Sequence, residues 1–356
     1  MAGTVCRRFN VNGHENISTS IEVNWTNNIT AFDSSSNRTA EVLDKYIIYV
    51  LEIFTNCVLL NIISLFGIIG NIINIIVLWK HGFRETTNIL LISLSAFDLM
   101  CSIILPVTRL KYIVSQFDEG LAISFNTFAT VYLFMPKYAC LATSFTYVTI
   151  IAVERFTAVF FPFKVSRIFS SSNTKVIAAV TPMCCLLALS PTFSALTYRW
   201  NFDARFNETT AVLEYTQFYR ENHDFLDLYV WVGLNNFFGS SSNVIITSCC
   251  VSILVKLSRV TAKREALTSR KTGYDVRVVK MLVTVCVVFL AASTPNIVLY
   301  SYFAPNYIFV SPVNELVDNI CVVFYAVNGS ANFLVYVTMS KKFANTYKML
   351  MSCSKT

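Results

Sequence analysis

The residues of this chain best placed to do chemistry are ionisable residues that lie inside apolar segments. Glu154 and Arg155 stand side by side in the stretch Ser144–Lys164, SFTYVTIIAVERFTAVFFPFK, and Asp98 is a single carboxylate in the phrase LSAFDL. Ionisable groups are costly at membrane depth, so such residues usually serve function and have partners. For Glu154 and Arg155 the alternative is a helix end whose charges simply reach the membrane surface.

An enzyme or a metal protein is not indicated by the remaining reactive residues. The three histidines, His14, His81 and His223, fall in a tail and two loops, so no catalytic or metal-binding cluster can be assembled from them. Most of the eleven cysteines lie in apolar segments, where they behave as small apolar side chains, and no disulfide framework is expected.

The composition is that of an integral membrane protein. Apolar residues make up 54% of the chain and charged residues 14%, whereas soluble domains carry about 25% charged residues. The mean hydropathy is +0.55. A spanning helix needs about 20 apolar residues, which predicts an all-α, seven-helix membrane bundle over residues 45–339. Its expected spans are Cys57–Trp79, Ile89–Arg109, Phe128–Phe160, Lys175–Leu196, Asp227–Leu257, Val276–Phe303 and Val313–Met339.

The loop charges predict the orientation of these spans. Basic residues follow the first, third, fifth and seventh spans: Lys80, Arg84, Lys164, Arg167, Lys256, Arg259, Lys263, Arg264, Arg270, Lys271, Lys341 and Lys342. The opposite connections are mixed or acidic, and basic loops stay on the cytoplasmic side. We therefore expect a multi-pass plasma-membrane protein with its N-terminus outside and its C-terminus inside.

Both ends of the chain carry signals that agree with this orientation. Residues 1–44 are polar and lack an apolar leader, so we expect an extracellular tail and a first span that acts as the signal anchor. N-glycosylation acceptors occur at Asn16, Asn24, Asn28, Asn37 and, in a later external connection, Asn207. Residues 340–356 predict a cytoplasmic amphipathic helix on membrane lipid, followed by Cys353, either a palmitoylation site or a free thiol.

An ordered set of residues resembles the pattern of rhodopsin-like (class A) G-protein-coupled receptors. The set consists of Asn71, Asp98, the triplet Glu154–Arg155–Phe156, Pro191, Pro295 and the phrase NFLVY at Asn332–Tyr336. It covers nearly the whole chain after residue 55. The resemblance implies a receptor that activates a heterotrimeric G protein and binds arrestin. Glu154, Arg155 and Phe156 would form its cytoplasmic switch, and Tyr336 would support the active arrangement.

The resemblance also implies a buried polar network. In the family, the aspartate of the second helix joins a serine of the third helix and asparagines of the seventh around a sodium ion. The matching residues are Asp98, Ser144, Asn328 and Asn332, with Asn71 adjacent. A further serine of the family pattern is Gly329 here, which removes one possible ligand.

The chain departs from the family at several positions. The cysteine expected at the outer end of the third helix is Thr130, and the second external loop, roughly 197–226, has no cysteine. The common external disulfide is therefore missing, and we expect this loop to be unpinned. The other departures are Ala292-Ser293-Thr294 before Pro295, Phe333 and Asn243 in place of prolines, and Thr181 in place of a tryptophan.

The expected ligand pocket lies between the outer halves of the helices. Lys137 stands where amine receptors carry an aspartate, so it disfavours an amine ligand. With Arg109 and Lys111 it could receive a carboxylate, a sulfate or an acidic side chain. Alternatively, Lys137 pairs with Glu315 or Asp318, or reaches outward. The predicted pocket residues are Arg109, Lys137, Asn235, Asn296, Tyr300 and Asn319.

Two ligand classes remain open. The motifs favour a neuropeptide and resemble those of divergent invertebrate receptors, while the missing disulfide favours a chemosensory receptor for a small water-borne ligand. Ala326 replaces the retinal-binding lysine of opsins. A transporter is a remote alternative, because the chain shows no inverted repeat. Nucleic acid is not an expected partner.

Overall fold

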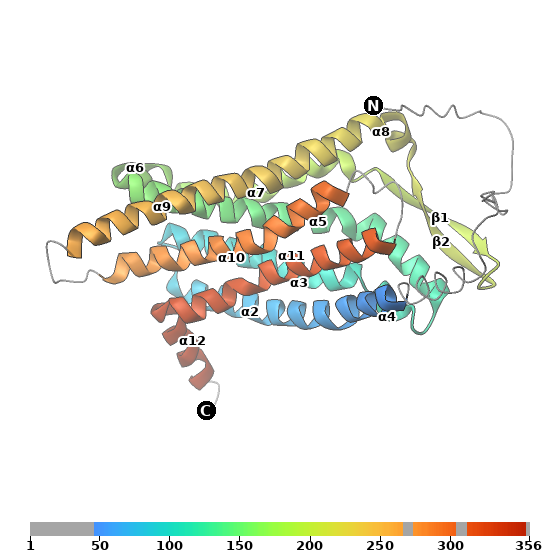
Figure 1. Cartoon of the computed structure of the whole chain (residues 1–356), viewed down its shortest axis with the longest axis horizontal. Coiled ribbons are helices and arrows are strands. Elements are labelled where there is room, and N and C mark those ends of the chain that lie inside the picture. Colours follow the sequence, from blue (N-terminus) through green and yellow to red (C-terminus); the bar gives the residue numbers. More distant parts are fainter. Residues whose placement is uncertain (1–45, 266–272, 304–311, 354–356) are drawn as a thin grey trace, which may run out of the picture. The chain divides into compact units, whose positions relative to one another are not determined.

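Long apolar helices run side by side through the described residues, 46–265, 273–303 and 312–353 of the computed structural model (Figure 1). Six helices in these ranges are long and apolar enough to cross a membrane: Tyr46–His81, Thr86–Val114, Glu119–Phe160, Ser171–Thr192, Gly233–Val260 and Glu315–Met339. A further helix, α10 (Gly273–Phe303), contains the shorter apolar segment Val283–Leu299. These helices fit the predicted seven-helix bundle.

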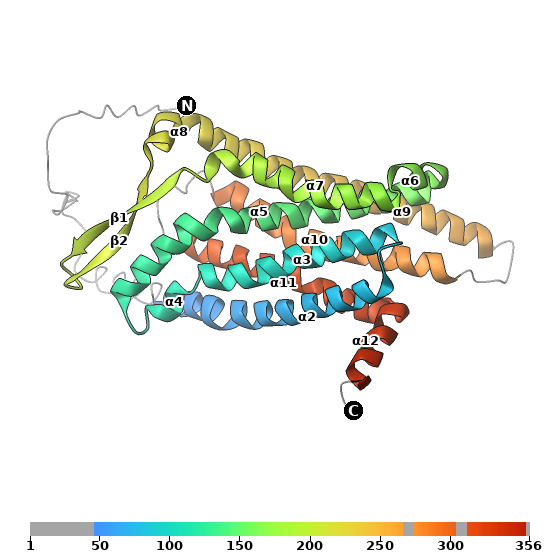
Figure 2. The same cartoon turned by 180° about the vertical axis from the view of Figure 1, so that it is seen from behind.

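The elements follow one another with short connections. In chain order they are η1 (Phe54–Leu59), α2 (Leu60–His81), α3 (Thr86–Thr108), α4 (Lys111–Val114), α5 (Glu119–Phe160), α6 (Pro162–Ile168), α7 (Ser171–Leu189), η2 (Ser190–Thr192), β1 (Leu196–Asp203), β2 (Glu208–Tyr215), α8 (Gln217–Leu228), η3 (Tyr229–Ser240), α9 (Ser241–Glu265), α10, α11 (Pro312–Met339) and α12 (Lys341–Cys353). Figures 1 and 2 place β1, β2 and α8 at one end of the bundle and α6 and α12 at the other. We call these the hairpin end and the Arg155 end.

The third long helix, α5, extends well beyond its apolar segment. It begins at Glu119 rather than near Phe128, because Asp118 caps it by accepting a 2.8 Å hydrogen bond from the Leu121 amide. Hydropathy marks only the part of a helix that suits lipid, so the polar outer turns of α5 were not predicted.

The core is built around α5, which contacts α3, α7, α9 and α10. Large side chains at its centre are almost fully buried, including Leu94, Tyr147, Ile151 and Phe289. The Tyr147 hydroxyl also donates a 2.6 Å hydrogen bond to the Ala178 carbonyl of α7. The outer surface, in contrast, exposes many apolar side chains, as expected of a bundle that contacts lipid.

Two glycines let α2 approach its neighbours closely. A Cβ atom on Gly67 would lie 2.6 Å from the Ser102 Oγ of α3, and one on Gly70 would lie 2.9 Å from the Phe333 Cβ of α11. Small residues at such contacts allow helix backbones to pack tightly in a membrane. Both glycines therefore fix the spacing of α2, α3 and α11.

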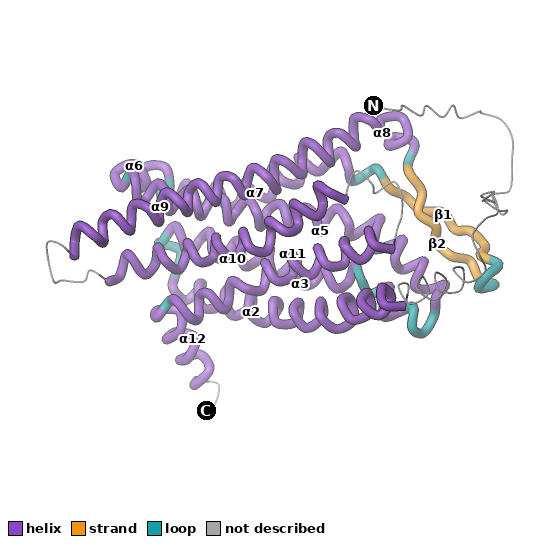
Figure 3. The backbone as a smooth tube through the Cα atoms, viewed as in Figure 1, coloured by secondary structure: helices purple, strands orange, loops and turns teal. Residues whose placement is uncertain are grey.

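The loop predicted to be the second external one is attached to the bundle, so the prediction that it is unpinned is wrong. Residues Leu196–Asp203 and Glu208–Tyr215 form the antiparallel hairpin β1–β2, drawn in orange in Figure 3. Thr127 of α5 donates a 2.8 Å hydrogen bond to the Ala211 carbonyl, and the Ala211 amide donates one of 3.1 Å to Ser124 Oγ.

Aromatic packing strengthens this attachment. The Phe128 ring of α5 meets the rings of Tyr198 and Trp200 edge-on, at centroid distances of 5.0 and 5.7 Å. Edge-to-face pairs of this kind each contribute about 0.5–1.5 kcal/mol beyond their buried area. Hydrogen bonds and aromatic contacts thus hold the loop at the place where the family uses a disulfide.

The amphipathic helix predicted after the last span is α12. It docks at the Arg155 end through Phe343 and Tyr347, whose ring centroids lie 6.4 and 5.9 Å from that of Phe333. Thr346 of the same helix lies 3.0 Å from His81 Nε2 of α2. This helix therefore packs on α11 and α2.

Candidate functional site

The Glu154–Arg155 pair lies near the end of α5 and is joined by two parallel hydrogen bonds. Arg155 Nε donates to Glu154 Oε2 at 2.9 Å, and Nη2 donates to Oε1 at 2.7 Å. Glu154 is only 2% exposed. A bidentate pair of opposite charges is the stable way to bury both groups.

The first turn of α3 completes this arrangement. Thr86 donates a 2.7 Å hydrogen bond to Glu154 Oε1, and Arg155 Nη2 donates to Thr87 Oγ1. The N-terminus of a helix carries a partial positive charge, which also favours the Glu154 carboxylate. Sequence reasoning did not find Thr86 and Thr87; their only signal is their place at the start of the second span.

The other two predicted switch residues, Phe156 and Tyr336, are not bonded to the pair. The Phe156 ring stacks on Phe160 with centroids 4.6 Å apart. Tyr336 is 1% exposed, and its hydroxyl has no hydrogen-bond partner within the described ranges. A buried hydroxyl without a partner costs about 1–3 kcal/mol. The Tyr336 hydroxyl is therefore available to form a hydrogen bond in another arrangement of the helices.

Asp98 is the centre of the predicted polar network. Its Oδ1 accepts a 2.6 Å hydrogen bond from Ser144 of α5, and its Oδ2 accepts one of 2.8 Å from Asn332 of α11. Asn71 of α2 donates instead to the Gly329 carbonyl at 2.9 Å. Asn328 is buried one turn before Asn332 but makes no hydrogen bond to Asp98.

The atoms around Asp98 suit a small cation in charge and type. Hard cations prefer oxygen ligands, and Asp98 and Ser144 supply them. Ser95, one turn before Asp98 on α3, is fully buried, and within the described residues its Oγ has no hydrogen-bond partner. Gly329 supplies no side-chain oxygen, although a Cβ there would lie only 3.7 Å from the Asp98 Cβ.

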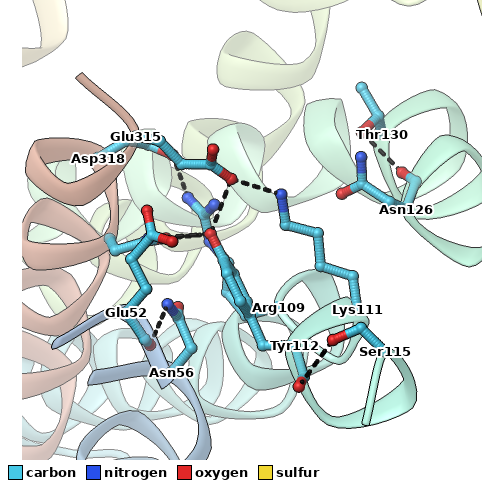
Figure 4. A network of polar contacts seen from close by, with 11 residues as sticks. Glu52, Asn56, Arg109, Lys111, Tyr112, Ser115, Asn126, Thr130, Glu315 and Asp318 are labelled. Carbon is cyan, nitrogen blue, oxygen red and sulfur yellow. Dashed lines mark hydrogen bonds and ion pairs between the residues drawn. The ribbon is translucent and has the colours of Figure 1, made fainter. Parts of the chain in front are cut away.

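A second polar network lies at the hairpin end (Figure 4). Arg109 pairs with Asp318, and Lys111 Nζ lies 2.7 Å from Glu315 Oε1. The Tyr112 hydroxyl donates to Glu315 at 2.9 Å. Asn319, one of the predicted pocket residues, donates to the same hydroxyl at 2.9 Å. Arg109, Lys111 and Asn319 are thus engaged with side chains of the chain itself.

Lys137 is not paired with Asp318 or Glu315. It is 5% exposed, and its Nζ lies 4.8 and 4.7 Å from the ring centroids of Phe134 and Tyr138. Among the described residues its ammonium makes no ion pair or hydrogen bond. The two rings compensate only part of its lost hydration, about 2 kcal/mol for a desolvated contact.

The remaining pocket residues differ in their surroundings. Asn296 of α10 is 2% exposed, and neither polar atom of its amide has a partner in the described ranges. Asn235 is half-buried in η3. Tyr300 belongs to α10, but its side chain is outside the described residues.

Two of the departures from the family pattern meet each other. Asn243 of α9 accepts a 2.9 Å hydrogen bond from Ser293 of α10, and its amide lies 3.4 Å from Thr294 Oγ1. These residues occupy positions where the family carries a proline and part of a conserved phrase before Pro295. Their joint replacement creates a polar link between α9 and α10.

The predicted modification sites are only partly visible. Asn207 is exposed at the tip of the hairpin with a positive φ of 54°. Asn16, Asn24, Asn28 and Asn37 lie outside the described residues, as does the side chain of Cys353, the last residue of α12.

Comparisons with known proteins agree with this geometry. The sequence model of the family "7 transmembrane receptor (rhodopsin family)" matches residues 70–336. The chain is 24% identical over 309 residues to an FMRFamide receptor of Drosophila melanogaster, covering 84% of this chain and 54% of that receptor. It is 23% identical over 323 residues to an Allatostatin-A receptor of Bombyx mori, covering 88% of this chain and 82% of that receptor.

A shorter match concerns a QRFP-like peptide receptor of Branchiostoma floridae. It is 31% identical over 121 residues, which are 33% of this chain and 30% of that receptor. The chain therefore spans about half the length of the Drosophila receptor and a smaller part of the Branchiostoma one.

Proposed function

The chain belongs to the rhodopsin family of seven-transmembrane receptors, and on this premise we propose that it converts binding of an extracellular neuropeptide into activation of a heterotrimeric G protein. The observation that carries the proposal is the buried Glu154–Arg155 pair held by the first turn of α3. The names of three relatives, receptors for FMRFamide, Allatostatin-A and a QRFP-like peptide, support a peptide ligand.

The proposed orientation places the hairpin end outside the cell and the Arg155 end in the cytoplasm. The basic residues between spans support it. In this orientation the plasma membrane surrounds the bundle, Asn16, Asn24, Asn28, Asn37 and Asn207 are available for glycosylation, and α12 with Cys353 lies on the inner lipid surface. Arrestin would compete with the G protein for the Arg155 end.

Release of Arg155 is the proposed switching step. In the described arrangement Glu154 and Thr87 engage the guanidinium, so it is not available to a partner. A ligand that binds the opened arrangement more tightly by a few kcal/mol is sufficient to shift the population. The unpaired Tyr336 hydroxyl supports the proposal, since a rearrangement that gives it a partner is favoured.

The ligand would contact Lys137 and Asn296. Both are almost fully buried. The amide of Asn296 has no hydrogen-bond partner among the described residues, and the Lys137 ammonium contacts only the rings of Phe134 and Tyr138 there. Asp318 attracts the Lys137 ammonium but is itself paired with Arg109, which repels Lys137. A carboxylate or another anionic group in direct contact would satisfy the ammonium better. We therefore propose that an acidic group of the ligand reaches Lys137. Asn235, Tyr300 and the engaged residues Arg109 and Asn319 would form nearby walls.

A sodium ion at Asp98 is a further part of the proposal. Asp98, Ser144 and Ser95 would hold it, with Asn71, Asn328 and Asn332 around them. When bound there, the ion would neutralise the carboxylate. The hydrogen bonds that Asp98 accepts from Ser144 and Asn332 hold α3, α5 and α11 together without it.

A chemosensory receptor is the competing proposal. Its main support is the missing external disulfide, which peptide receptors usually keep. Ser124, Thr127 and Phe128 hold this loop without a disulfide, which weakens that support. Three relatives are peptide receptors by name. The peptide proposal is therefore preferred.

One experiment separates these proposals. Cells that express the receptor with a promiscuous G protein are challenged with a neuropeptide library and a library of small water-borne compounds. We expect calcium responses to peptides, abolished by Arg155→Ala at unchanged surface expression. Arg167→Ala, on the exposed helix α6, is the matched control and should respond normally. Responses that persist in Arg155→Ala, or ion flux without a G protein, would contradict the proposal.

A further inference from the structure

Five charged side chains lie close together at the hairpin end, and one of them has no ion-pair partner among the described residues. The acids are Glu52, Glu315 and Asp318, and the bases are Arg109 and Lys111 (Figure 4). Arg109 is paired with Asp318 and Lys111 with Glu315. Glu52, in the first helix, makes no ion pair or side-chain hydrogen bond with any described residue, and its Oε1 is fully buried.

A second unsatisfied oxygen lies one turn further along the same helix. Asn56 is 2% exposed, and within the described ranges its Oδ1 has no hydrogen-bond donor. Its amide nitrogen is engaged, donating to the Glu52 carbonyl at 2.9 Å. Both free atoms are therefore acceptors. Asn56 belongs to the turn Phe54–Leu59, which contacts α11 and α4, and Glu52 lies two residues before that turn.

The local backbone supports a specialised role for this turn. Residues Phe54–Leu59 form the π-helical turn η1, which is wider than an α-helical turn. The Asn61 side chain donates to the Asn56 and Cys57 carbonyls at 2.8 and 3.2 Å and so holds the widened turn. Such π turns cost stability and occur frequently at functional sites.

The charges near Glu52 do not satisfy it. Its electrostatic neighbours are Glu315, which repels it, and Lys111 and Arg109, which are engaged with other acids. Lys137 is not one of these neighbours. Glu52 is half-buried, and its fully buried Oε1 has no hydrogen-bond donor among the described residues. A cation with several N–H donors would satisfy that oxygen and offset the repulsion by Glu315.

We propose that Glu52 and Asn56 form a subsite for an organic cation, a guanidinium group of the receptor's peptide ligand. A guanidinium presents donors in a planar fork, which suits two acceptors one helical turn apart. The inference rests on the proposed function, because it assigns part of the ligand. Lys137 would receive an acidic group of the same ligand. The ligand would therefore carry charges of both signs, and its basic group would lie against the first helix.

The subsite can be tested on the purified full-length receptor without a known agonist. Thermal unfolding is followed with arginine amide, with citrulline amide, and with sodium chloride against choline chloride. Citrulline amide keeps the α-amino group of arginine amide but has an uncharged side chain, so it isolates the effect of the guanidinium. We expect arginine amide to raise the melting temperature in a concentration-dependent way and citrulline amide to leave it unchanged. Glu52→Gln should raise the half-maximal concentration of arginine amide at least tenfold. Glu214→Gln, which removes a half-buried hairpin acid paired with Arg199, should not.

Glu52→Gln also has an expected effect without any ligand. Because Glu52 is half-buried and repelled by Glu315, removal of its charge should leave the melting temperature of the free receptor unchanged or raise it. A folded Glu52→Gln receptor is therefore expected, so the comparison of arginine amide affinities can be made.

Three results would overturn the subsite. The first is the absence of stabilisation by arginine amide, and the second is equal stabilisation of wild type and Glu52→Gln. The third is stabilisation by sodium that disappears in Glu52→Gln, because it would assign the site to an inorganic cation. None of these readouts uses signalling. Arg155-dependent signalling with no binding of arginine amide would therefore reject the subsite alone. Binding of arginine amide that depends on Glu52, in a receptor without Arg155-dependent signalling, would reject the proposed function alone.

Discussion

Phe333 of α11 lies directly against the bare backbone of Gly70 on α2. A Cβ atom at position 70 would lie only 2.9 Å from the Phe333 Cβ. The same ring faces Phe343 and Tyr347 of α12. The phenylalanine that replaces the family's proline therefore joins the first span, the last span and the terminal helix.

Gly70→Ala should destabilise the receptor by about 1–3 kcal/mol, because the added methyl group overpacks the contact with Phe333. Thermal unfolding of the purified protein measures this. Gly233→Ala is the control, since its Cβ would meet only Tyr229 at an ordinary 3.7 Å. Equal melting temperatures for the two variants would show that α2 and α11 are not in close contact.

Thr87→Val should raise basal signalling. The valine keeps the shape of the side chain but removes the hydroxyl that accepts from Arg155. A hydrogen bond to a charged group contributes about 1.5–3 kcal/mol, so the fraction of receptors with a released Arg155 should rise about tenfold or more.

Basal G-protein activation at equal surface expression is the readout for this variant. Thr149→Val, which removes a hydroxyl bonded only within α5, should leave it unchanged. If Thr87→Val signals at the wild-type basal level, the first turn of α3 does not restrain Arg155.

Asp98→Asn should abolish any stabilisation of the receptor by sodium. The amide keeps the volume of the side chain, but it lacks the charge that would attract the ion. Melting temperatures in sodium chloride and in choline chloride measure the effect without an agonist. Ser102→Ala removes a hydroxyl bonded to the Asp98 backbone and should retain the sodium response. An unchanged response in Asp98→Asn would reject the sodium site.

Ser124→Ala combined with Thr127→Val should loosen the hairpin. Each lost hydrogen bond to Ala211 contributes about 1 kcal/mol, so the Ala211 amide should exchange its hydrogen roughly ten- to a hundredfold faster. Hydrogen exchange followed by mass spectrometry reports this directly. Thr130→Val, whose hydroxyl bonds only within α5, is the control.

A reducing agent should not reproduce the effect of that double variant. The cysteines of the described residues, Cys57, Cys101, Cys140, Cys184, Cys185, Cys249, Cys250, Cys286 and Cys321, are all free thiols. Faster exchange of the wild-type hairpin after reduction would indicate a disulfide and contradict the hydrogen-bonded attachment.

Thr209→Ala should remove one glycan by destroying the acceptor sequence at Asn207. The change leaves Asn207 itself in its positive-φ conformation, which asparagine tolerates well. Electrophoretic mobility with and without glycosidase measures the loss. Thr209→Ser keeps the acceptor sequence and should migrate like wild type; identical mobility of both variants would place the hairpin end away from the glycosylating compartment.

The sequence predicted the spans because long apolar helices are specified by composition alone. It also predicted that Asp98 would meet Ser144 and Asn332, because the resemblance assigns each of them a place. It did not predict the β1–β2 hairpin. The contacts of Ala211 with Ser124 and Thr127 join residues more than 80 positions apart, which no local pattern reveals.

The sequence also did not predict which charged residues pair with each other. The predicted spans place Arg109, Lys111 and Lys137 toward the same end of the bundle, but they do not show which of these charges is neutralised. That depends on the rotation of α11, which brings Asp318 and Glu315 to the first two and leaves the third between aromatic rings. Thr86 and Thr87 were missed for the same reason, since their role depends on how α3 packs on α5.

The length of α5 has a kinetic consequence. Its 42 residues span about 63 Å at 1.5 Å per residue, roughly twice the 30 Å of the hydrocarbon layer. In the proposed orientation, its outer turns carry the hairpin into the water beyond the bundle. A diffusing peptide would encounter the hairpin before it reaches Lys137 or Glu52. Changes in the hairpin should therefore alter how fast a peptide associates more than how long it stays bound.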